Sequence, residues 1–162
     1  MVNDTAVAAE DIYIGDGGSN SLLVSSVDVK KPDQIVDNTM ILSQYVDIYV
    51  SESAFYLYQR KGYWDDVVTQ IAKFDLSDGK MNAVGAVSAN GRVTDTFAVN
   101  ECEGKLRVLT SGQNAVSGEA ENNLYLFDEN LNLTGKIEGL AQGEEIYAAR
   151  YLGNMAYFVT YR

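Results

Sequence analysis

The feature that most constrains the fold of this chain is an imperfect internal repeat. The clearest copy runs from Asn122 to Arg162, and earlier copies run from Asn20 to Arg60 and from Thr69 to Gly112. The aspartates that end the first strand of each copy are 47 and 53 residues apart, at Asp28, Asp75 and Asp128. The aromatic residues that open the second half are 48 and 50 residues apart, at Tyr49, Phe97 and Tyr147. A repeat of this period indicates that one structural unit is built three times.

Within each copy, short runs of β-branched and aromatic residues alternate with turn residues. The dipeptide Asp78-Gly79 predicts a hairpin between Val68–Asp75 and Met81–Val87. In the expected strand Phe55–Gln59, alternate side chains point to opposite sides. Phe55 and Leu57 face one way, and Tyr56 and Tyr58 face the other. Both faces of this strand are therefore expected to be covered. Nowhere does an apolar stripe at helical spacing extend through a stretch of helical length. The chain is therefore predicted to be all-β.

Several short strands repeated at this period are typical of the blades of a β-propeller. The strands predict a β-propeller-like array of four-stranded antiparallel blades, with about two complete blades and two half-blades. Complete blades are expected at Val46–Val87 and Val93–Glu138, the second opening with a strand over Val93–Asn100. Half-blades are expected at Ser21–Leu42 and Glu145–Tyr161.

The first twenty residues are set apart from this array. Residues 1–20 are predicted to be a flexible N-terminal arm or an edge of the expressed piece, with Asp11–Ile14 as a candidate short strand. Residues 21–162 are predicted to form one partial β-propeller domain. Because unpaired strand edges promote association, two copies are expected to complete each other's half-blades as a homodimer. The alternative is a monomeric curved array.

The composition excludes several classes of function. The formal net charge is −11, so the surface repels phosphate backbones, and neither nucleic acid nor an anionic membrane is an expected partner. The chain has no histidine and one cysteine, which excludes His-based catalytic triads, His metal sites and an intramolecular disulfide. No apolar run has the length of a membrane-spanning helix, and no cofactor is indicated.

The acidic motifs predict neither a metal site nor catalytic residues. Asp128-x-Asn130-x-Asn132 resembles the start of a calcium loop, but Leu133 stands where the loop needs glycine, so a hairpin turn is the better interpretation. Glycosidases use paired carboxylates. The adjacent pairs Asp65-Asp66 and Glu144-Glu145 would point to opposite faces of a strand, so neither pair can flank one substrate bond alone.

Three residues are the candidates for binding a ligand or partner. Tyr63 and Trp64 lie in an aromatic loop between strands, where they would stack on a sugar or anchor a protein. The alternative for Trp64 is a cap folded over the edge of a blade. Arg150, inside an expected strand, would either grip a ligand carboxylate from a central channel or bridge to an acidic residue of the next blade.

The order of these motifs carries a resemblance to a known family. The segment Gly143-Glu-Glu-Ile-Tyr147, followed by Arg150-Tyr-Leu-Gly153 and Tyr157-Phe-Val-Thr160, resembles the secreted bacterial and archaeal β-propeller-domain family, a distant relative of WD40 repeats. The resemblance covers about Ser21 to Arg162, and the family domain would continue into another strand pair. It implies a propeller fold and a secreted or extracytoplasmic location, and it supplies no catalytic residues.

Two functions are compatible with these observations. The first is a non-catalytic binding or scaffold module of an exported or cell-surface bacterial protein, which holds an unknown protein or glycan. The second is a fragment of a carbohydrate-active enzyme with carboxylates gathered around a propeller channel. Fold alone does not decide between them, because function lies in the site.

Overall fold

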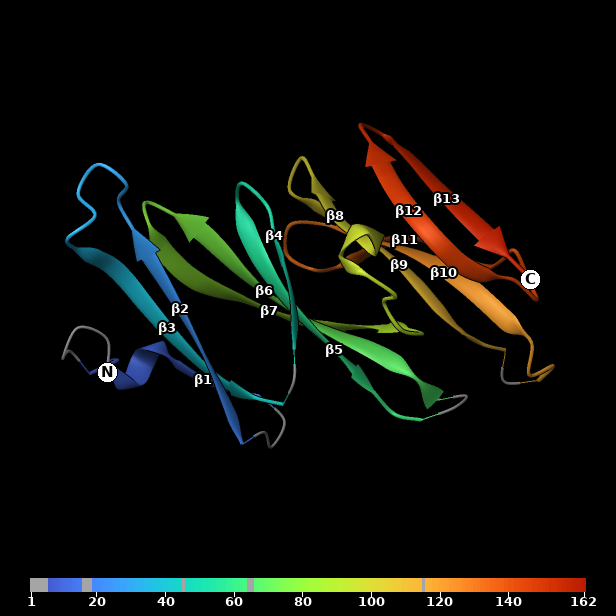
Figure 1. The fold of residues 1–162 in the computed structure, drawn as a ribbon, viewed down its shortest axis with the longest axis horizontal. Coiled ribbons are helices and arrows are strands. Elements are labelled where there is room, and N and C mark those ends of the chain that lie inside the picture. The colour runs from blue at the N-terminus through green and yellow to red at the C-terminus, as the bar shows by residue number, and fades with distance from the viewer. Residues whose placement is uncertain (1–5, 16–18, 45, 64–65, 115) are drawn as a thin grey trace.

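A computed structural model gives the fold and describes residues 6–15, 19–44, 46–63, 66–114 and 116–162. Its strands form four sheets that stand side by side in a row from the N-terminus to the C-terminus (Figure 1). No α-helix is present in the described residues. The structure confirms the predicted all-β, propeller-like array.

The two central sheets are complete blades with four antiparallel strands each. The first blade contains β4 (Asp47–Val50), β5 (Ala54–Lys61), β6 (Val68–Ser77) and β7 (Lys80–Asn90), paired in that order. The second blade contains β8 (Val99–Cys102), β9 (Lys105–Gln113), β10 (Ala120–Phe127) and β11 (Leu133–Leu140), also in chain order. Each blade is therefore a meander joined by short turns.

The outer two sheets are the predicted half-blades. The N-terminal half-blade is the antiparallel pair β2 (Asn20–Val27) and β3 (Ile35–Ser43). The C-terminal half-blade is the antiparallel pair β12 (Glu145–Leu152) and β13 (Met155–Tyr161). Part of the N-terminal segment that was predicted as an arm is a paired strand. After the short 3-10 turn η1 (Ala9–Asp11), strand β1 (Ile12–Ile14) pairs in parallel with β3. The predicted short strand is thus present.

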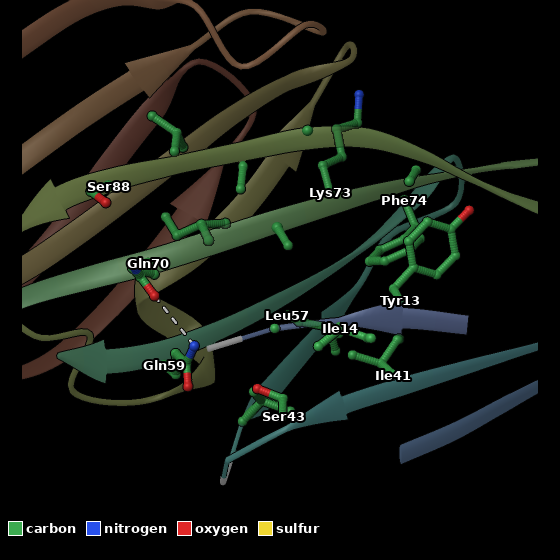
Figure 2. A pocket seen from close by; sticks show the side chains of 18 residues that line it. Tyr13, Ile14, Ile41, Ser43, Leu57, Gln59, Gln70, Lys73, Phe74 and Ser88 are labelled. Atoms are coloured by element: carbon green, nitrogen blue, oxygen red, sulfur yellow. Dashed lines mark hydrogen bonds between the residues drawn. The ribbon is translucent and has the colours of Figure 1, made fainter. Parts of the chain in front are cut away.

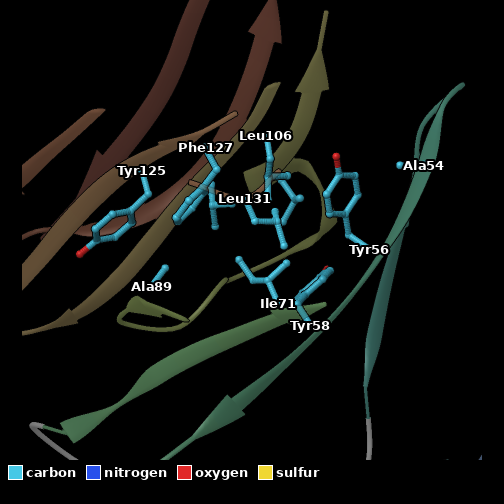
Figure 3. Close-up of a cluster of buried hydrophobic side chains, with 11 residues drawn as sticks. Ala54, Tyr56, Tyr58, Ile71, Ala89, Leu106, Tyr125, Phe127 and Leu131 are labelled. Carbon is cyan, nitrogen blue, oxygen red and sulfur yellow. The ribbon is translucent and has the colours of Figure 1, made fainter. Parts of the chain in front are cut away.

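The core consists of three apolar clusters, one at each junction between neighbouring sheets. Phe55 and Leu57 pack in the cluster between the N-terminal half-blade and the first blade, whereas Tyr56 and Tyr58 pack in the cluster between the two complete blades. Figure 3 shows the latter cluster, in which Tyr56 and Leu106 lie close to each other. The third cluster packs the C-terminal half-blade against the second blade. Both faces of β5 are therefore covered, as its alternation predicts.

The prediction of a strand over Val93–Asn100 is wrong in its first six residues. Residues Thr96–Ala98 form a 3-10 turn, η3, and β8 begins only at Val99. The cause is Asp95, whose carboxylate accepts hydrogen bonds from the backbone N–H groups of Phe97 (2.7 Å) and Ala98 (3.1 Å). A side-chain acceptor of this kind competes with strand pairing and caps the turn instead.

Within the described residues, the structure has no helix with the length and apolarity needed to cross a membrane.

Candidate ligand-binding site

A polar groove of about 410 Å³ lies at one rim of the array and is the best candidate for a binding site. Its residues come from the last positions of β5 and β9, the first positions of β10 and β12, and the loops beside them. They are Arg60, Tyr63, Val67, Arg92, Ser111, Gly112, Gln113, Ala120 and Glu145. The groove, called the rim groove below, therefore draws on both complete blades and the C-terminal half-blade. Its volume is that of a small-ligand site.

Arg92 is presented to the rim groove by a tightly held linker between β7 and β8. The Arg92 backbone N–H donates to the Ser111 carbonyl oxygen at 2.8 Å, and the Arg92 carbonyl oxygen accepts from the Ser111 N–H at 2.9 Å. The preceding Gly91 has a φ of +86°, and a side chain there would lie 2.9 Å from the Ser111 carbonyl oxygen. Only glycine fits this conformation and this close approach. The buried hydroxyl of Thr69 also donates to the Gly91 carbonyl at 2.8 Å.

Arg60 and Tyr63 reach the groove from the first blade. Arg60 continues the row of alternate β5 side chains that includes Tyr56 and Tyr58, so it lies on the side of the second blade. Tyr63 follows in the loop after β5, and 77% of its surface is exposed. Gly62 makes this turn possible, because its φ is +79° and an added Cβ would lie 2.2 Å from the Asp66 carbonyl oxygen.

Glu145 enters the groove from the first position of β12. The linker before it is anchored by Asn122, a fully buried residue whose side-chain amide donates to the carbonyls of Leu140 and Glu144, each at 3.0 Å. The Asn122 side-chain oxygen accepts from the Ser111 hydroxyl at 2.7 Å. One buried amide thus ties the groove wall of the second blade to the start of the C-terminal half-blade.

The rim groove combines two cations with one anion and an exposed aromatic ring. Among the residues that the structure describes, no carboxylate lies within ion-pairing distance of Arg60 or Arg92. Unpaired guanidinium groups can bind a carboxylate through two parallel hydrogen bonds. The tyrosine ring offers an apolar face for stacking. The arrangement can therefore bind a polar ligand, and among the described residues it holds one carboxylate rather than the facing pair that glycoside hydrolysis uses.

A larger groove of about 680 Å³ lies between β1, β3 and the first blade, and its walls are mainly apolar (Figure 2). Its two amide side chains bond to each other, with Gln59 donating to Gln70 at 3.3 Å. Figure 2 shows Lys73 directed away from this groove; its ammonium group donates to the Glu129 carbonyl of the second blade at 2.7 Å and pairs with Asp75 at 2.9 Å. This groove offers few polar groups for recognition.

The structure places two of the three predicted binding residues, Tyr63 and Arg150, in different surroundings. Tyr63 lines the rim groove, whereas Trp64 lies outside the described residues. The Arg150 guanidinium lies 4.0 Å from the centroid of the Phe97 ring, and its Nη1 donates to the Ala149 carbonyl at 2.6 Å. The alternative bridge from Arg150 to an acidic residue of the next blade is absent among the described residues. Arg150 instead makes a cation–π contact between the C-terminal half-blade and η3.

The motif that resembles a calcium loop is a hairpin turn between β10 and β11, as expected. The Asp128 carboxylate accepts from the backbone N–H groups of Asn130 (2.9 Å) and Asn132 (2.8 Å) and from the Asn132 side-chain amide (3.0 Å). These three bonds lower the pKa of Asp128, the side-chain bond being the strongest cause. In the described part of the chain, no group of three acidic or cysteine side chains converges on one point.

A second cluster of polar side chains joins the first and second blades. The Glu101 carboxylate accepts from the hydroxyls of Tyr56 (2.6 Å), Ser51 (2.9 Å) and Ser53. The Glu101 backbone N–H donates to the Tyr49 hydroxyl oxygen at 3.0 Å. Burial raises the pKa of Glu101, but the three hydroxyl donors outweigh burial and hold this pKa below its usual value of 4.5. Burial, with Glu101 beside it, raises the pKa of Tyr56.

We expect the Glu101 contacts to lose their stabilising effect in acid. Because the pKa of Glu101 is lower in the folded chain than in the unfolded chain, its contribution is complete above about 4.5 and falls as the pH drops through the folded pKa. The free energy of unfolding of wild type and Glu101→Gln should therefore differ most at neutral pH and converge below it. Urea unfolding of both proteins at a series of pH values from 7 to 3 measures this difference in the free energy of unfolding. A difference that stays constant over this range would contradict the prediction.

Sequence reasoning found Tyr63 but missed Arg60, Arg92 and Glu145 as members of one site. Arg92 follows the turn dipeptide Asn90-Gly91, which marks a tight connection at the end of a strand. Arg60 lies three residues before Tyr63 and directly follows the predicted strand Phe55–Gln59. Both arginines are therefore expected at the rim of the array, where strands end. Whether their side chains come together depends on how the blades stack.

Four-stranded meanders stacked face to face, with linkers that cross from each blade to the next and a groove at the rim, define a β-propeller module. All of the chain, residues 1–162, matches the family described as "Beta propeller domain", and the chain belongs to this family.

Two archaeal relatives show similarity to part of the chain. An uncharacterised protein of Methanocaldococcus jannaschii is 40% identical over 102 residues, which is 62% of this chain and 16% of that protein. An uncharacterised protein of Archaeoglobus fulgidus is 42% identical over 94 residues, which is 58% of this chain and 14% of that protein. The similar region therefore spans about a sixth of each relative or less. No solved structure gives a significant match.

Proposed function

We propose that the chain is a non-catalytic binding module of an exported or cell-surface protein and that the rim groove holds its ligand, a protein segment or a glycan. The observation that carries this proposal is the convergence, in one groove built from three successive sheets, of an exposed tyrosine and two arginines that have no ion-pair partner among the described residues. A groove with a few convergent polar groups and an aromatic surface is a common form of ligand site.

The rigidity of the groove supports a binding role. The linker that carries Arg92 and the linker that carries Glu145 are each fixed by buried hydrogen bonds, through Thr69 and Asn122 respectively. Side chains on a preorganised backbone lose less conformational entropy when a ligand binds. Catalysis by paired carboxylates has less support, because Glu145 is the one acidic residue among those that line the rim groove in the described part.

The proposal predicts that Tyr63→Ala weakens binding. The probes are arrayed oligosaccharides, both neutral and charged, and arrayed peptides, each tested with purified wild-type chain. We expect saturable binding to at least one class of probe, and an increase in Kd of about tenfold for Tyr63→Ala because stacking on the ring is lost.

Tyr147→Ala is the matched control, since Tyr147 is 73% exposed and does not line the rim groove. It should bind like wild type. Absence of binding to every probe, or binding that Tyr63→Ala leaves unchanged, would overturn the proposal.

A further inference from the structure

We infer that the ligand of the rim groove is a carboxylated sugar, such as a hexuronic acid unit of an acidic glycan. This inference rests on the binding function proposed above and specifies its ligand. It follows from the arginines, from the single carboxylate and from the aromatic ring of the groove.

The first argument is the contrast between the arginines inside and outside the groove. Arg107 donates to the Asn100 side chain and the Gly153 carbonyl, Arg150 lies over the Phe97 ring, and Arg162 pairs with Glu144 at 3.6 Å. By contrast, Arg60 and Arg92 have no such partner among the described residues.

That contrast is informative because the chain has a net charge of −11. Both guanidinium groups are exposed to solvent and have no ion-pair partner among the described residues, so they are available to a negatively charged ligand. A carboxylate fits the planar fork of an arginine in a bidentate manner.

Glu145 gives the second argument, because it restricts how the negative charge of the ligand is placed. A ligand that places a carboxylate directly beside Glu145 would be repelled by this side chain. A sugar acid presents one carboxylate and several hydroxyl groups on a single ring. The hydroxyls can donate to Glu145 and to the side-chain oxygen of Gln113, which lines the same groove.

The aromatic ring gives the third argument. Tyr63 is 77% exposed, and its ring can stack on the apolar C–H face of a sugar while the hydroxyl stays in water. An acidic peptide has no flat apolar face next to its carboxylate. The three features together therefore favour a sugar acid over an acidic peptide.

The test uses tetragalacturonate as the probe and isothermal titration calorimetry as the measurement. The neutral galactose tetramer of the same linkage and a tetraglutamate peptide are the comparison ligands. We expect tetragalacturonate to bind at least about tenfold more tightly than either, because each charge-assisted contact that is lost weakens binding by about that factor or more. Arg60→Gln and Arg92→Gln should each raise its Kd by at least about tenfold.

Glu145→Ala separates sugar recognition from simple charge attraction. The change makes the groove more positive, so an ion held only by charge would bind more tightly. We expect the opposite for tetragalacturonate, a several-fold weaker binding, because hydroxyl acceptors are removed. Lys80→Gln, at the exposed first position of β7 and outside the groove, removes one positive charge and should leave the Kd unchanged.

Three outcomes would overturn the inference: equal binding of the neutral tetramer, tighter binding of tetraglutamate, or tighter binding of tetragalacturonate by Glu145→Ala. In each of these cases the proposed binding function survives if Tyr63→Ala still weakens binding of some probe on the arrays. If no probe binds at all, the proposed function fails as well.

Discussion

Tyr56→Ala is expected to destabilise the array by about 3–5 kcal/mol, the range for truncation of a large aromatic side chain in a core. Tyr56 is fully buried between the two complete blades, and its ring contributes to the cluster in Figure 3. The substitution also removes the hydroxyl that donates to Glu101 at 2.6 Å. Urea unfolding followed by tyrosine fluorescence measures the loss, and a loss below about 1 kcal/mol would contradict the assigned core.

Tyr56→Phe is the matched variant, because it keeps the ring and removes the hydroxyl alone. Glu101 then retains Ser51 and Ser53 as donors. The expected loss is about 1.5–3 kcal/mol, the usual contribution of a hydrogen bond to a charged group. Tyr63→Ala, on an exposed side chain, should change stability by less than about 0.5 kcal/mol.

In solution, we propose that two copies of this chain pair head to tail. Among the described strands, one edge of β2 and one edge of β13 have no partner. In both complete blades the second and third strands pair over eight residues, and β2 and β13 have nearly that length, with eight and seven residues. Pairing of β13 with β2 of a second copy would complete two further blades.

One face of β13 is apolar and exposed. Each of its four side chains has more than half of its surface exposed: Met155, Tyr157, Val159 and Tyr161. The double variant Tyr157→Lys/Val159→Lys should raise the Kd of the dimer at least about a hundredfold, because each buried apolar side chain contributes about 1.5–3 kcal/mol. Sedimentation equilibrium over a range of concentrations measures the Kd of the dimer. Val116→Lys, at a position that is 97% exposed in a loop, is the control.

A wild-type chain that sediments as a monomer at every concentration would contradict the dimer and support the monomeric curved array. A dimer that the double lysine variant leaves intact would show that copies associate through another surface.

The fold could be predicted largely because local residues determine it. Asp28 and Asp128 directly follow β2 and β10, and Asp75 lies near the end of the equivalent strand β6, so their spacing reports the repeat directly. The alternation in Phe55–Tyr58 identified a strand buried on both faces before any partner was known. The strand over Val93–Asn100 was mispredicted because the capping side chain of Asp95 prevails over the β propensity of its neighbours.

The site could be predicted only in part, because it depends on contacts between blades. Tyr63 was recognisable from its own loop, but its neighbours in the groove come from positions 92 and 145, on linkers that lie far along the chain. For Arg150, sequence reasoning considered only charged partners, whereas stacking brings it onto the Phe97 ring. Residues that meet across sheets give no local signal of their meeting.

The two buried faces of β5 also determine how the array can open. The strand contributes to two separate clusters, so detaching the first blade exposes apolar surface on both sides at once. The C-terminal half-blade packs through one face alone, because its other face carries exposed Tyr157 and Val159. Local opening should therefore begin at β12 and β13, while the first blade opens only with global unfolding. The centre of the array forms one cooperative unit, and the bond from the Asn122 side chain to the Glu144 carbonyl keeps the Glu145 side of the rim groove attached to it.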